Sequence, residues 1–481
     1  MPHDAGRMEQ IIVPLSARPQ VALDGAIFLS RVQRVFQALG LAMRRYRTAV
    51  VGLQIAVVVF YLLLLLIPAA LPLPGEEARI LDHITRFAQF AFWGVWWPFV
   101  ILSSMVFGRL WCGVLCPEGA ISEWASHRGL GRGVPHWMKW GGWPFAAFLS
   151  TTVFGQLVSV YEYPKAAALV LGGSTLVAVA VGLLYGRNKR VWCRYLCPAS
   201  GVFALLAKVS PVHFRVDQKA WDAAPSGTRT SSKHAVNCAP LIDIRRMRPA
   251  SACHMCGRCA GERNAVRLNL RSPNSELLRV RDAPRRWEIA LLVFGILGVA
   301  VGAFQWSASP WFVEIKQQIA TWLLDRDLMW PLQGNAPWWL LTHYPEKNEV
   351  FTWLDGALIV SYIGTTAAAV SAWSAGWLFA GARIAAMSAW RLAYALLPFA
   401  GLSAFIGLSA LTVTLLRAEG FVLAWVNPLR AVLLGAGLLW SARLAWGLAP
   451  AGWIRKLAAC GATLAASSAV LWLWIEIFYV W

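Results

Sequence analysis

Eight of the nine cysteines of this chain lie within residues 112–259, and they are the residues best suited to carry chemistry. Three of them form the run Cys253-His-Met-Cys256-Gly-Arg-Cys259. Thiolates at this spacing can converge from a tight turn on one corner of an iron–sulfur cube, and bacterial ferredoxins use the same C-x2-C-x2-C run. Zinc sites more often use two separated cysteine pairs. The run therefore predicts an iron–sulfur ligand set, with a zinc site or a chance spacing as the alternatives.

The run is incomplete as a set of four ligands. In ferredoxins a Cys-Pro pair follows, whereas here Ala-Gly-Glu-Arg-Asn follows Cys259. A fourth ligand must come from elsewhere in the chain. Cys238 is the nearest free thiol, and Cys116 and Cys197, each followed by proline, are the other candidates.

The remaining four clustered cysteines form two pairs in a motif that occurs twice, as Arg109-Leu-Trp-Cys-Gly-Val-Leu-Cys-Pro117 and as Arg190-Val-Trp-Cys-Arg-Tyr-Leu-Cys-Pro198. Residues four apart share one face of a helix, so each pair can direct two thiolates the same way. The alternative is four small buried cysteines at a membrane edge, since free cysteine often behaves as a core residue. Core packing alone does not explain two identically framed pairs.

Eight thiolates provide two sets of four, which is what two [4Fe–4S] clusters require. The simpler partition gives the four repeat cysteines one cluster, and gives the other cluster Cys238 together with the C-x2-C-x2-C run. A partition in which one Cys-Pro cysteine completes that run stays open. Cys460 lies alone in an apolar stretch and is interpreted as a packing residue. The predicted cofactor-binding and metal-ligating residues are Cys112, Cys116, Cys193, Cys197, Cys238, Cys253, Cys256 and Cys259, and no catalytic side chain is predicted.

Several arginines lie close to these cysteines in the sequence, namely Arg190, Arg194, Arg258 and Arg263. Such cations offset the negative charge of a thiolate-bound cluster and tend to raise its reduction potential. They are equally what the excess of Lys and Arg in cytoplasmic loops would produce. The sequence does not separate the two roles.

The elements that position the cysteines belong to a membrane protein. Of the 481 residues, 58% are hydrophobic and 14% are charged, whereas soluble globular chains are usually about 45–50% apolar and about 25% charged. The net charge of +20 does not indicate nucleic-acid binding, because the Lys and Arg residues flank apolar segments and form no basic domain. The fold class is therefore predicted to be an all-α polytopic membrane protein with a small ferredoxin-like iron–sulfur segment in a cytoplasmic loop.

About nine transmembrane helices are expected, since a span needs about 20 mostly apolar residues. The expected spans are 49–70, 90–107, 144–162, 166–185, 288–306, 356–378, 393–416, 430–449 and 457–479. The loops that carry the arginines alternate with loops that do not. This alternation predicts that the N-terminus and the cysteine motifs lie on the cytoplasmic side of a bacterial inner membrane. An odd number of spans would leave the C-terminus outside.

The segments follow from this pattern. The segment 1–48 is expected to be a cytoplasmic N-terminus with an amphipathic helix over 25–47, either lying on the lipid surface or simply solvated. The apolar residues of that helix are Phe28, Val32, Val35, Phe36 and Leu39. The other expected units are a four-helix membrane unit with both Cys-x3-Cys-Pro motifs (49–200), the cytoplasmic ferredoxin-like segment (201–286), a fifth helix with a tryptophan-rich periplasmic loop (287–355) and C-terminal membrane helices (356–481). The tryptophans are interpreted as an interfacial belt, or as a docking surface for a periplasmic partner.

These motifs resemble those of the membrane polyferredoxin family, the group that contains NapH-, NosR- and CcoG-like proteins. The shared features are Gly-Arg-x-x-Cys-x3-Cys-Pro after a membrane helix, as in Gly108 to Pro117, a second Cys-x3-Cys-Pro, and a following ferredoxin-like segment. The resemblance covers roughly residues 49–275 and implies that the repeat cysteines and the Cys253–Cys259 run bind clusters. The chain departs from the family in carrying one incomplete ferredoxin run and no periplasmic flavin domain. The whole architecture is similar to polyferredoxins that accompany bacterial periplasmic iron-uptake systems.

Three functions follow as hypotheses. The first is electron transfer through two clusters between a membrane or periplasmic partner and the cytoplasm, in support of iron uptake. Clusters on one face cannot carry electrons across a hydrocarbon core about 30 Å thick, so a quinone or a redox partner protein is implied. Partners would be membrane lipid and, by the resemblance, an iron permease or cupredoxin. The second is an iron or copper reductase or a respiratory accessory protein, and the third a zinc-stabilised membrane scaffold. The chain is expected to be an electron carrier rather than a stand-alone enzyme.

Overall fold

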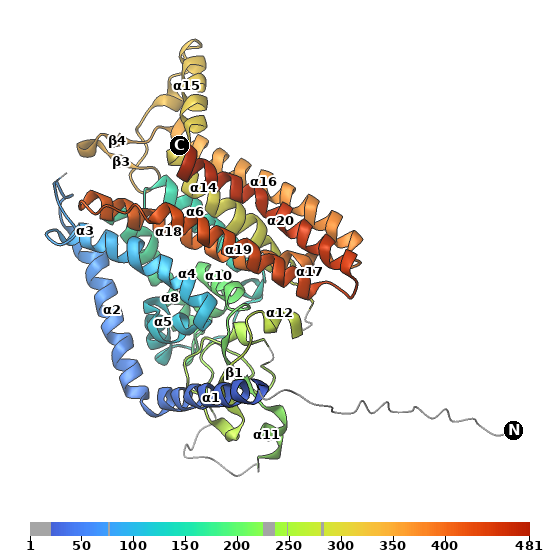
Figure 1. Ribbon diagram of the computed structural model, residues 1–481. Helices are drawn as coiled ribbons and strands as arrows, with labels where there is room; N and C mark the ends of the chain where they lie inside the picture. Colours follow the sequence, from blue (N-terminus) through green and yellow to red (C-terminus); the bar gives the residue numbers. More distant parts are fainter. Residues whose placement is uncertain (1–20, 76, 225–235, 248, 280–282) are drawn as a thin grey trace, which may run out of the picture.

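A computed structural model describes residues 21–75, 77–224, 236–247, 249–279 and 283–481, with side chains from residue 31 onward. Long helices build most of the molecule (Figure 1). They stand between two ends of different character. One end carries all eight clustered cysteines, and we call it the cysteine face; the other, the opposite face, carries α15 (Pro310–Leu324) and the hairpin of β3 (His343–Tyr344) and β4 (Glu349–Val350).

The predicted membrane architecture is confirmed, because eight helices of the described chain are long and apolar enough to cross a membrane. They include the three spans that carry Arg383, Arg391 and Arg443 in or near them. The eight are Arg47–Ala70 (α2), Ile84–Phe107 (α3, η1, α4), Pro164–Tyr185 (α7, η4, α8), Arg286–Ala308 (α13, η7, α14, η8), Trp353–Ile384 (α16), Ala389–Ala418 (α17, η11, α18), Val426–Leu448 (α19) and Trp453–Val480 (α20, η12).

The remaining expected span, 144–162, is shorter than predicted. It forms α6, Trp143–Leu157, of 15 residues, which at 1.5 Å per residue extends about 22 Å. The helix ends early because the chain turns at Ser159, whose φ is +49°. Its two ends nevertheless adjoin opposite faces. The Leu157 carbonyl accepts a hydrogen bond from the Thr342 amide at 2.8 Å beside the hairpin, and just before its first turn Trp140 packs edge-on against Trp287 at 4.9 Å.

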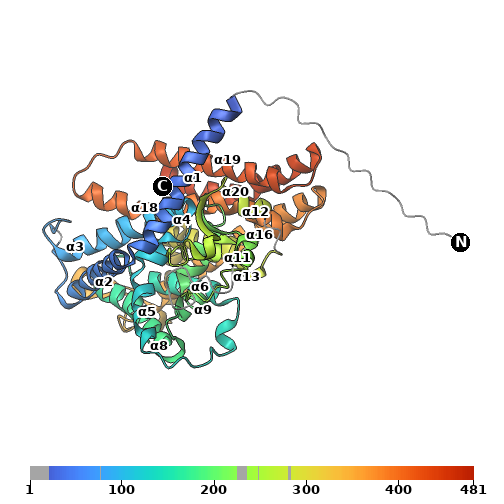
Figure 2. The same cartoon turned by 90° about the horizontal axis from the view of Figure 1, so that it is seen from below.

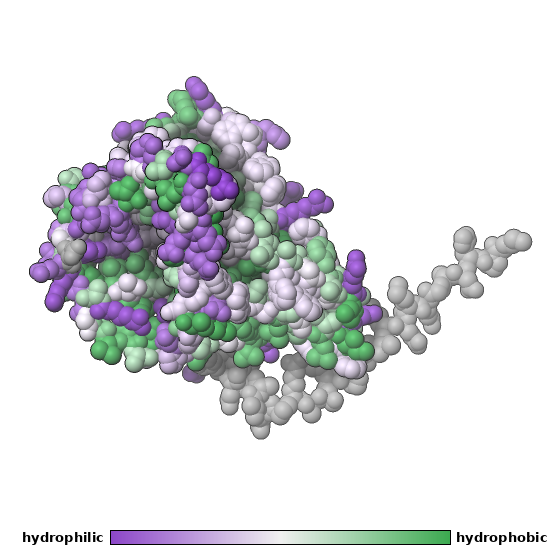
Figure 3. Space-filling model, turned by 90° about the horizontal axis from the view of Figure 1, so that it is seen from above, coloured by the Kyte–Doolittle hydropathy of each residue, from purple (hydrophilic) through white to green (hydrophobic). Residues whose placement is uncertain are grey.

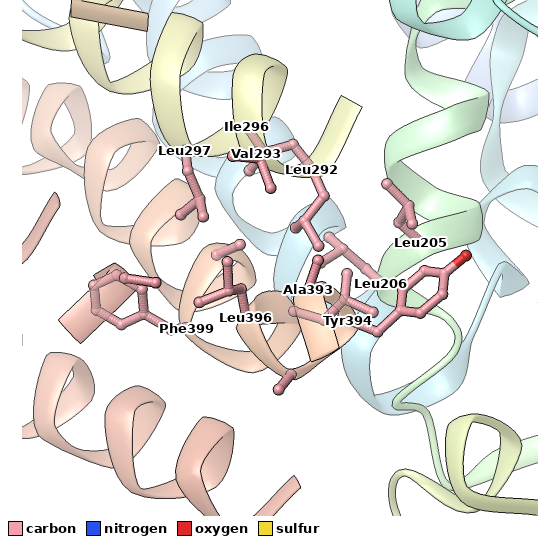
Figure 4. Close-up of a cluster of buried hydrophobic side chains, with 14 of the residues drawn as sticks. Leu205, Leu206, Leu292, Val293, Ile296, Leu297, Ala393, Tyr394, Leu396 and Phe399 are labelled. Atoms are coloured by element: carbon pink, nitrogen blue, oxygen red, sulfur yellow. The ribbon is translucent and has the colours of Figure 1, made fainter. Parts of the chain in front are cut away.

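The largest hydrophobic core lies where α10 (Pro198–Leu206), η7 (Leu291–Val299) and the α17–α18 segment meet (Figure 4). Leu206, Leu292 and Leu396 are completely buried there. Leu292 and Leu396 lie in membrane-spanning segments, where close packing rather than removal from water stabilises them, because lipid tails are as apolar as leucine. This core anchors α10, the helix that starts directly after the second Cys-x3-Cys-Pro motif, to the C-terminal helices.

A small antiparallel sheet supports the cysteine face. Strand β1 (Val212–Val216) pairs with β2 (Val266–Leu270), with Phe214 opposite Leu268. Helix α1 (Val21–Arg45) runs across this sheet, roughly perpendicular to α2 (Figures 1 and 2). On the opposite face hydrophilic residues gather, with hydrophobic surface beside them (Figure 3).

Candidate metal centre

The first cysteine pair lies at the break between two helices. Helix α4 (Trp97–Phe107) ends at Gly108, which adopts a φ of +62°, and the chain then makes one wide helical turn, η2 (Trp111–Leu115). Cys116 caps the next helix, α5 (Pro117–His127), because its sulfur accepts the Gly119 amide at 3.4 Å. Proline suits the first position of a helix, where its missing N–H would have no partner. The Cys-Pro step therefore starts a helix and places Cys116 at its N-terminus.

The second pair repeats this arrangement. Cys193 lies in the short helix α9 (Val191–Tyr195), and Cys197 directly precedes Pro198, the first residue of α10. The Ser200 hydroxyl donates to the Cys193 carbonyl at 2.8 Å and so holds the motif against the start of α10. In both motifs a short helical segment is followed by a Cys-Pro step at which the next helix starts.

The structure brings these four cysteines together. Burial raises the pKa of Cys116 well above its usual range, and the charges of Cys193 and Cys112 add to this effect. Burial likewise raises the pKa of Cys197, to which Cys193, Cys116 and Cys112 contribute, and raises the pKa of Cys193 to about 12. Burial and the neighbouring negative charges both disfavour the thiolate form of Cys116, Cys193 and Cys197. The group is thus a set of four thiols that a metal centre would convert into thiolates.

The other four clustered cysteines form a second group. Burial raises the pKa of Cys253, to which the charges of Cys259, Cys256 and Cys238 contribute. The same neighbours, Cys256 and Cys238, act on Cys259, whose pKa burial raises to about 12. This grouping matches the simpler of the two partitions. That each group holds one cube remains a prediction.

The Cys253–Cys259 loop has the local geometry of a ligand turn. Met255 and Gly257 adopt positive φ values of 56° and 73°, so the chain reverses twice within the run. The Met255 amide donates to the Cys253 sulfur at 3.4 Å. Helix α1 covers this loop: a Cβ added at Gly257 would lie 2.6 Å from Cβ of Met43. Glycine at this position therefore serves both the turn and the close approach of α1.

The two groups lie side by side. Gly113, between the first two cysteines, is packed so closely on the second group that an added Cβ would overlap the His254 carbonyl oxygen and lie 2.8 Å from the Cys256 amide nitrogen. Only glycine allows this approach. Arg190 lies at the same boundary, because its charge acts on both Cys193 and Cys256 and its Nη1 donates to the Cys112 carbonyl at 2.5 Å.

A buried ionic link joins the groups. The Glu123 carboxylate accepts from Arg190 Nε at 2.7 Å, and its other oxygen pairs with Arg258. The two arginines lower the pKa of Glu123 to about 2 against the opposing effect of burial. Arg190 comes from the second motif, Arg258 from the C-x2-C-x2-C run and Glu123 from the helix that follows the first motif. One carboxylate thus ties all three cysteine segments together.

Sequence reasoning missed Glu123 and its neighbour Glu118. Glu118 accepts a hydrogen bond from Trp192 Nε1 at 3.2 Å and another from Ser174, and burial raises its pKa. A signal was present, since these are the only acidic residues between Asp82 and Glu162. Two carboxylates in a long stretch otherwise devoid of them are candidates for specific pairing.

The donor set fits iron–sulfur cubes better than a single ion. Among the residues that the structure describes, no three His, Cys, Asp or Glu side chains converge closely enough to hold one metal ion. A cube spreads its thiolates over four iron atoms, so its ligands lie farther apart than those of a lone zinc ion. Cys460 is remote from both groups: its thiol donates to the Ala442 carbonyl at 3.2 Å on α19, consistent with packing.

Comparison with known proteins supports this chemistry. Residues 89–135 and 169–217 match the family model of a 4Fe–4S binding domain. Each matched segment contains one membrane helix end and one Cys-x3-Cys-Pro motif, whereas residues 238–259 lie outside both.

A curated relative is the electron transport protein YccM of Escherichia coli (strain K12), 23% identical over 248 residues. The alignment covers 46% of this chain and 66% of YccM, so the chain matches just under two thirds of that protein. No solved structure matches the chain. Together with the membrane helices, the family match supports a membrane protein that binds 4Fe–4S clusters, and electron transport is what the name of the relative describes.

Proposed function

We propose that this protein transfers electrons through two [4Fe–4S] clusters, one held by Cys112, Cys116, Cys193 and Cys197 and the other by the Cys238–Cys259 group. The observation that carries the proposal is the arrangement of the eight clustered cysteines, of which Cys112, Cys193 and Cys253 are buried, in two adjacent groups of four. When bound, each cube supplies one-electron redox chemistry. The cysteines of each group would hold one cube, and Arg190 lies at the boundary between the two groups.

The cysteine face is proposed to be cytoplasmic, because the arginine-rich loops belong to it. Electrons would then pass between the cytoplasmic side and a partner in the membrane or the periplasm. An apolar cavity of about 640 Å³ lies beside the first cysteine group, between α2 and the η1–α4 helix, and reaches Trp111 and Leu115. A cavity of this kind suits a lipid-soluble carrier such as a quinone, which supports the implied membrane partner.

Electron transfer is tested with the full chain in lipid nanodiscs. The protein is reduced under anaerobic conditions and mixed with an oxidised soluble acceptor, and its visible absorption is followed. We expect about two electrons per chain to reach the acceptor, one from each cube, and about half of that in Cys253→Ser. Clusters that form but cannot be reduced and reoxidised would indicate a structural role instead.

Support of iron uptake is the finer part of this proposal, with an iron permease and a cupredoxin as partners, and it rests on the resemblance of the cysteine motifs and overall architecture. Deletion of the gene should reduce growth that depends on ferrous iron, and Cys193→Ser should fail to restore it. A normal iron phenotype combined with lost respiratory activity would instead select a respiratory accessory role.

A further inference from the structure

The cysteine face contains a second feature that the cysteines do not line. It is a cavity of about 430 Å³ bounded by α6, α10, α13 (Arg286–Ala290) and the helical segment of α17 (Ala389–Ala393) and η11 (Tyr394–Leu396). This volume falls within the usual range of small-ligand sites, about 300–1,000 Å³. Its lining is strongly basic, because six cations contribute to it: Arg109, Lys139, Arg194, Lys208, Arg285 and Arg391.

The acidic residues of the cavity do not neutralise these cations. Glu288 is engaged by Lys208 at 3.1 Å and Arg285 at 3.9 Å, and it accepts the Tyr394 hydroxyl at 2.7 Å. Glu276 pairs with Arg271, which lies outside the cavity lining, at 3.1 Å. Within the described ranges, the other four cations form no ion pair, so the cavity keeps a clear positive excess.

Arg109 is the most informative of them. Arg109 is only 4% exposed. Its Nη2 donates to the Ser200 hydroxyl at 2.7 Å, whereas its Nε has no hydrogen-bond acceptor among the described residues. A buried charge with an unsatisfied donor is costly unless an opposite charge or acceptor reaches it. The basic excess of the cavity lining indicates an anionic occupant, and the unsatisfied Nε shows that the described residues do not fully compensate the charge of Arg109.

One wall of the cavity is apolar and continues toward the membrane helices. It is formed by Phe145 near the start of α6, Trp287 and Leu291 on the span that begins at Arg286, and Leu448 at the end of α19. A free inorganic anion would make no use of this wall. An occupant with a charged group and an apolar part would bury both in suitable surroundings.

We propose that this cavity binds a phosphate-bearing amphiphile, and that its source is the headgroup region of an anionic phospholipid. Arg109 and Arg391 hold the phosphate, while the acyl chains follow the wall of Phe145 and Leu291 between α6 and η7. Basic pockets between membrane helices on the positively charged side recognise anionic headgroups in this way. A water-soluble phosphate ester offers the same charge and is distinguished by the experiment.

The position of the cavity suggests a consequence for the neighbouring cysteines. Arg109 reaches the Cys193 carbonyl through the Ser200 hydroxyl, and Ser251 of the cavity precedes Cys253 by two residues. A bound anion would lower the reduction potential of a nearby cube. This consequence rests on the proposed function, whereas lipid binding does not depend on it.

Binding is tested on the full chain in nanodiscs of phosphatidylcholine to which phosphatidylglycerol is added in steps. Retained lipid is counted by native mass spectrometry, and thermal unfolding is followed by tryptophan fluorescence. The variants are Arg109→Gln and Arg391→Gln. The matched control is Arg455→Gln, an exposed arginine near the start of α20 that does not line the cavity.

We expect the wild type and Arg455→Gln to retain phosphatidylglycerol and to melt at higher temperature in its presence. The affinity should fall about tenfold or more in Arg109→Gln and in Arg391→Gln, because each removes a charged hydrogen bond. Arg391→Gln carries the test if Arg109→Gln fails to fold. Equal retention in wild type and variants would mean a non-specific lipid shell and would overturn the proposal. Protection by inorganic phosphate or glycerophosphate alone would overturn the lipid source.

Loss of lipid binding with unchanged iron content would support this inference independently of the clusters. Conversely, if the purified protein contains no iron but still retains phosphatidylglycerol, the result would contradict the proposed function and support the lipid site. The two failures are therefore distinguishable in a single preparation.

Discussion

At the scale of single residues, the contact that couples the two cysteine groups is the buried link of Glu123 with Arg190 and Arg258. The side chain of Arg190 is 2% exposed and that of Glu123 8%. Breaking such a pair leaves an unpaired charge inside the protein and typically costs about 3–5 kcal/mol. The link therefore holds the segments together and also sets the local positive charge at the thiolates.

Removing the more accessible cation should change the potential of the second group. In Arg258→Gln the positive charge beside the C-x2-C-x2-C run is lost, so reduction becomes less favourable. We expect the midpoint potential of one cluster to fall by roughly 50–100 mV, equivalent to a charge interaction of about 1–2 kcal/mol. EPR-monitored redox titration measures this.

Arg258→Lys is the matched control for this variant, because it keeps the charge and loses only the planar geometry of the guanidinium. Its potential should stay close to that of the wild type. Equal shifts in the Gln and Lys variants would assign Arg258 a purely structural role.

The cysteines could be proposed as ligands from the sequence because ligand spacing is local, and this role remains a prediction. The sequence favoured the simpler partition of the cysteines and left a second one open, because the packing of the first motif on the second group depends on contacts such as that of Gly113. Glu123 escaped notice for a similar reason: the partners of a carboxylate are set by the fold, and its two arginines lie 67 and 135 residues away.

At the scale of elements, α1 is a strap over the second cysteine group. Arg44 donates to the Ala260 carbonyl at 2.7 Å and pairs with Glu262 at 3.1 Å. Gly40 lies against β2, where an added Cβ would be 2.8 Å from Cβ of Leu268. The side of α1 that faces away from β2 exposes Val35 by 66% and Leu39 by 52%. That this side contacts lipid remains a prediction.

Displacing the strap should expose the second group. In Gly40→Val the new side chain collides with Leu268, so α1 lifts from β2 and the Cys253–Cys259 loop becomes accessible. We expect a strong chelator to remove iron faster than from the wild type, to about half of the total. Gly52→Val is the control, since nothing lies within 4 Å of that glycine on α2. An unchanged rate in Gly40→Val would show that α1 does not protect the loop.

The sheet beneath the strap should be sensitive to acid through His213 on β1. Burial and the charge of Arg271 lower the pKa of His213 to about 4, from an ordinary value of 6.5. Between these values the unfolded segment binds more protons than the folded one, so the stability of the sheet is lost as the pH falls from 6.5 toward 4. Hydrogen exchange of residues 212–216, corrected for intrinsic rates, should be up to about tenfold less protected at pH 5.5 than at pH 7.5.

His213→Gln removes the titrating group and should abolish this dependence. His136→Gln, at an exposed position on the same face, should leave it intact. A pH response that persists in His213→Gln would place the sensitive group elsewhere.

Hydropathy predicted the spanning helices well, because a 20-residue apolar stretch has few alternatives in a membrane. It could not show that α6 would be cut to 15 residues, since the turn at Ser159 depends on contacts with the hairpin 185 residues ahead. It also predicted α1 as amphipathic without indicating what covers its apolar side. Strand β2 covers part of the apolar side of α1, so neither lipid nor solvent covers all of that side.

At the scale of the whole molecule, the path of α6 decides where the termini lie. Its two ends adjoin opposite faces, so the described part of the chain crosses between the faces nine times if α6 is counted with the eight longer helices. The N-terminal helix and the C-terminus would then face opposite sides of the membrane, as Figure 1 shows for the molecule itself.

Reporter fusions in a bacterial host test this topology. Alkaline phosphatase fused after Trp481 should be active, and green fluorescent protein fused at the N-terminus should fluoresce, because each works on only one side of the inner membrane. A fluorescent C-terminal fusion would mean an even number of crossings and would exclude α6 as one of them.

The central claim is that two cubes occupy the two cysteine groups, and iron analysis combined with EPR of anaerobically purified protein tests it most directly. The rule of four thiolates per cube predicts about eight iron atoms per chain. Cys193→Ser and Cys253→Ser should each retain about four with a different signal lost, Cys238→Ala should lose the same signal as Cys253→Ser, and Cys460→Ser should retain all eight. Iron near zero, stoichiometric zinc in its place, or both signals intact in Cys238→Ala would contradict the account.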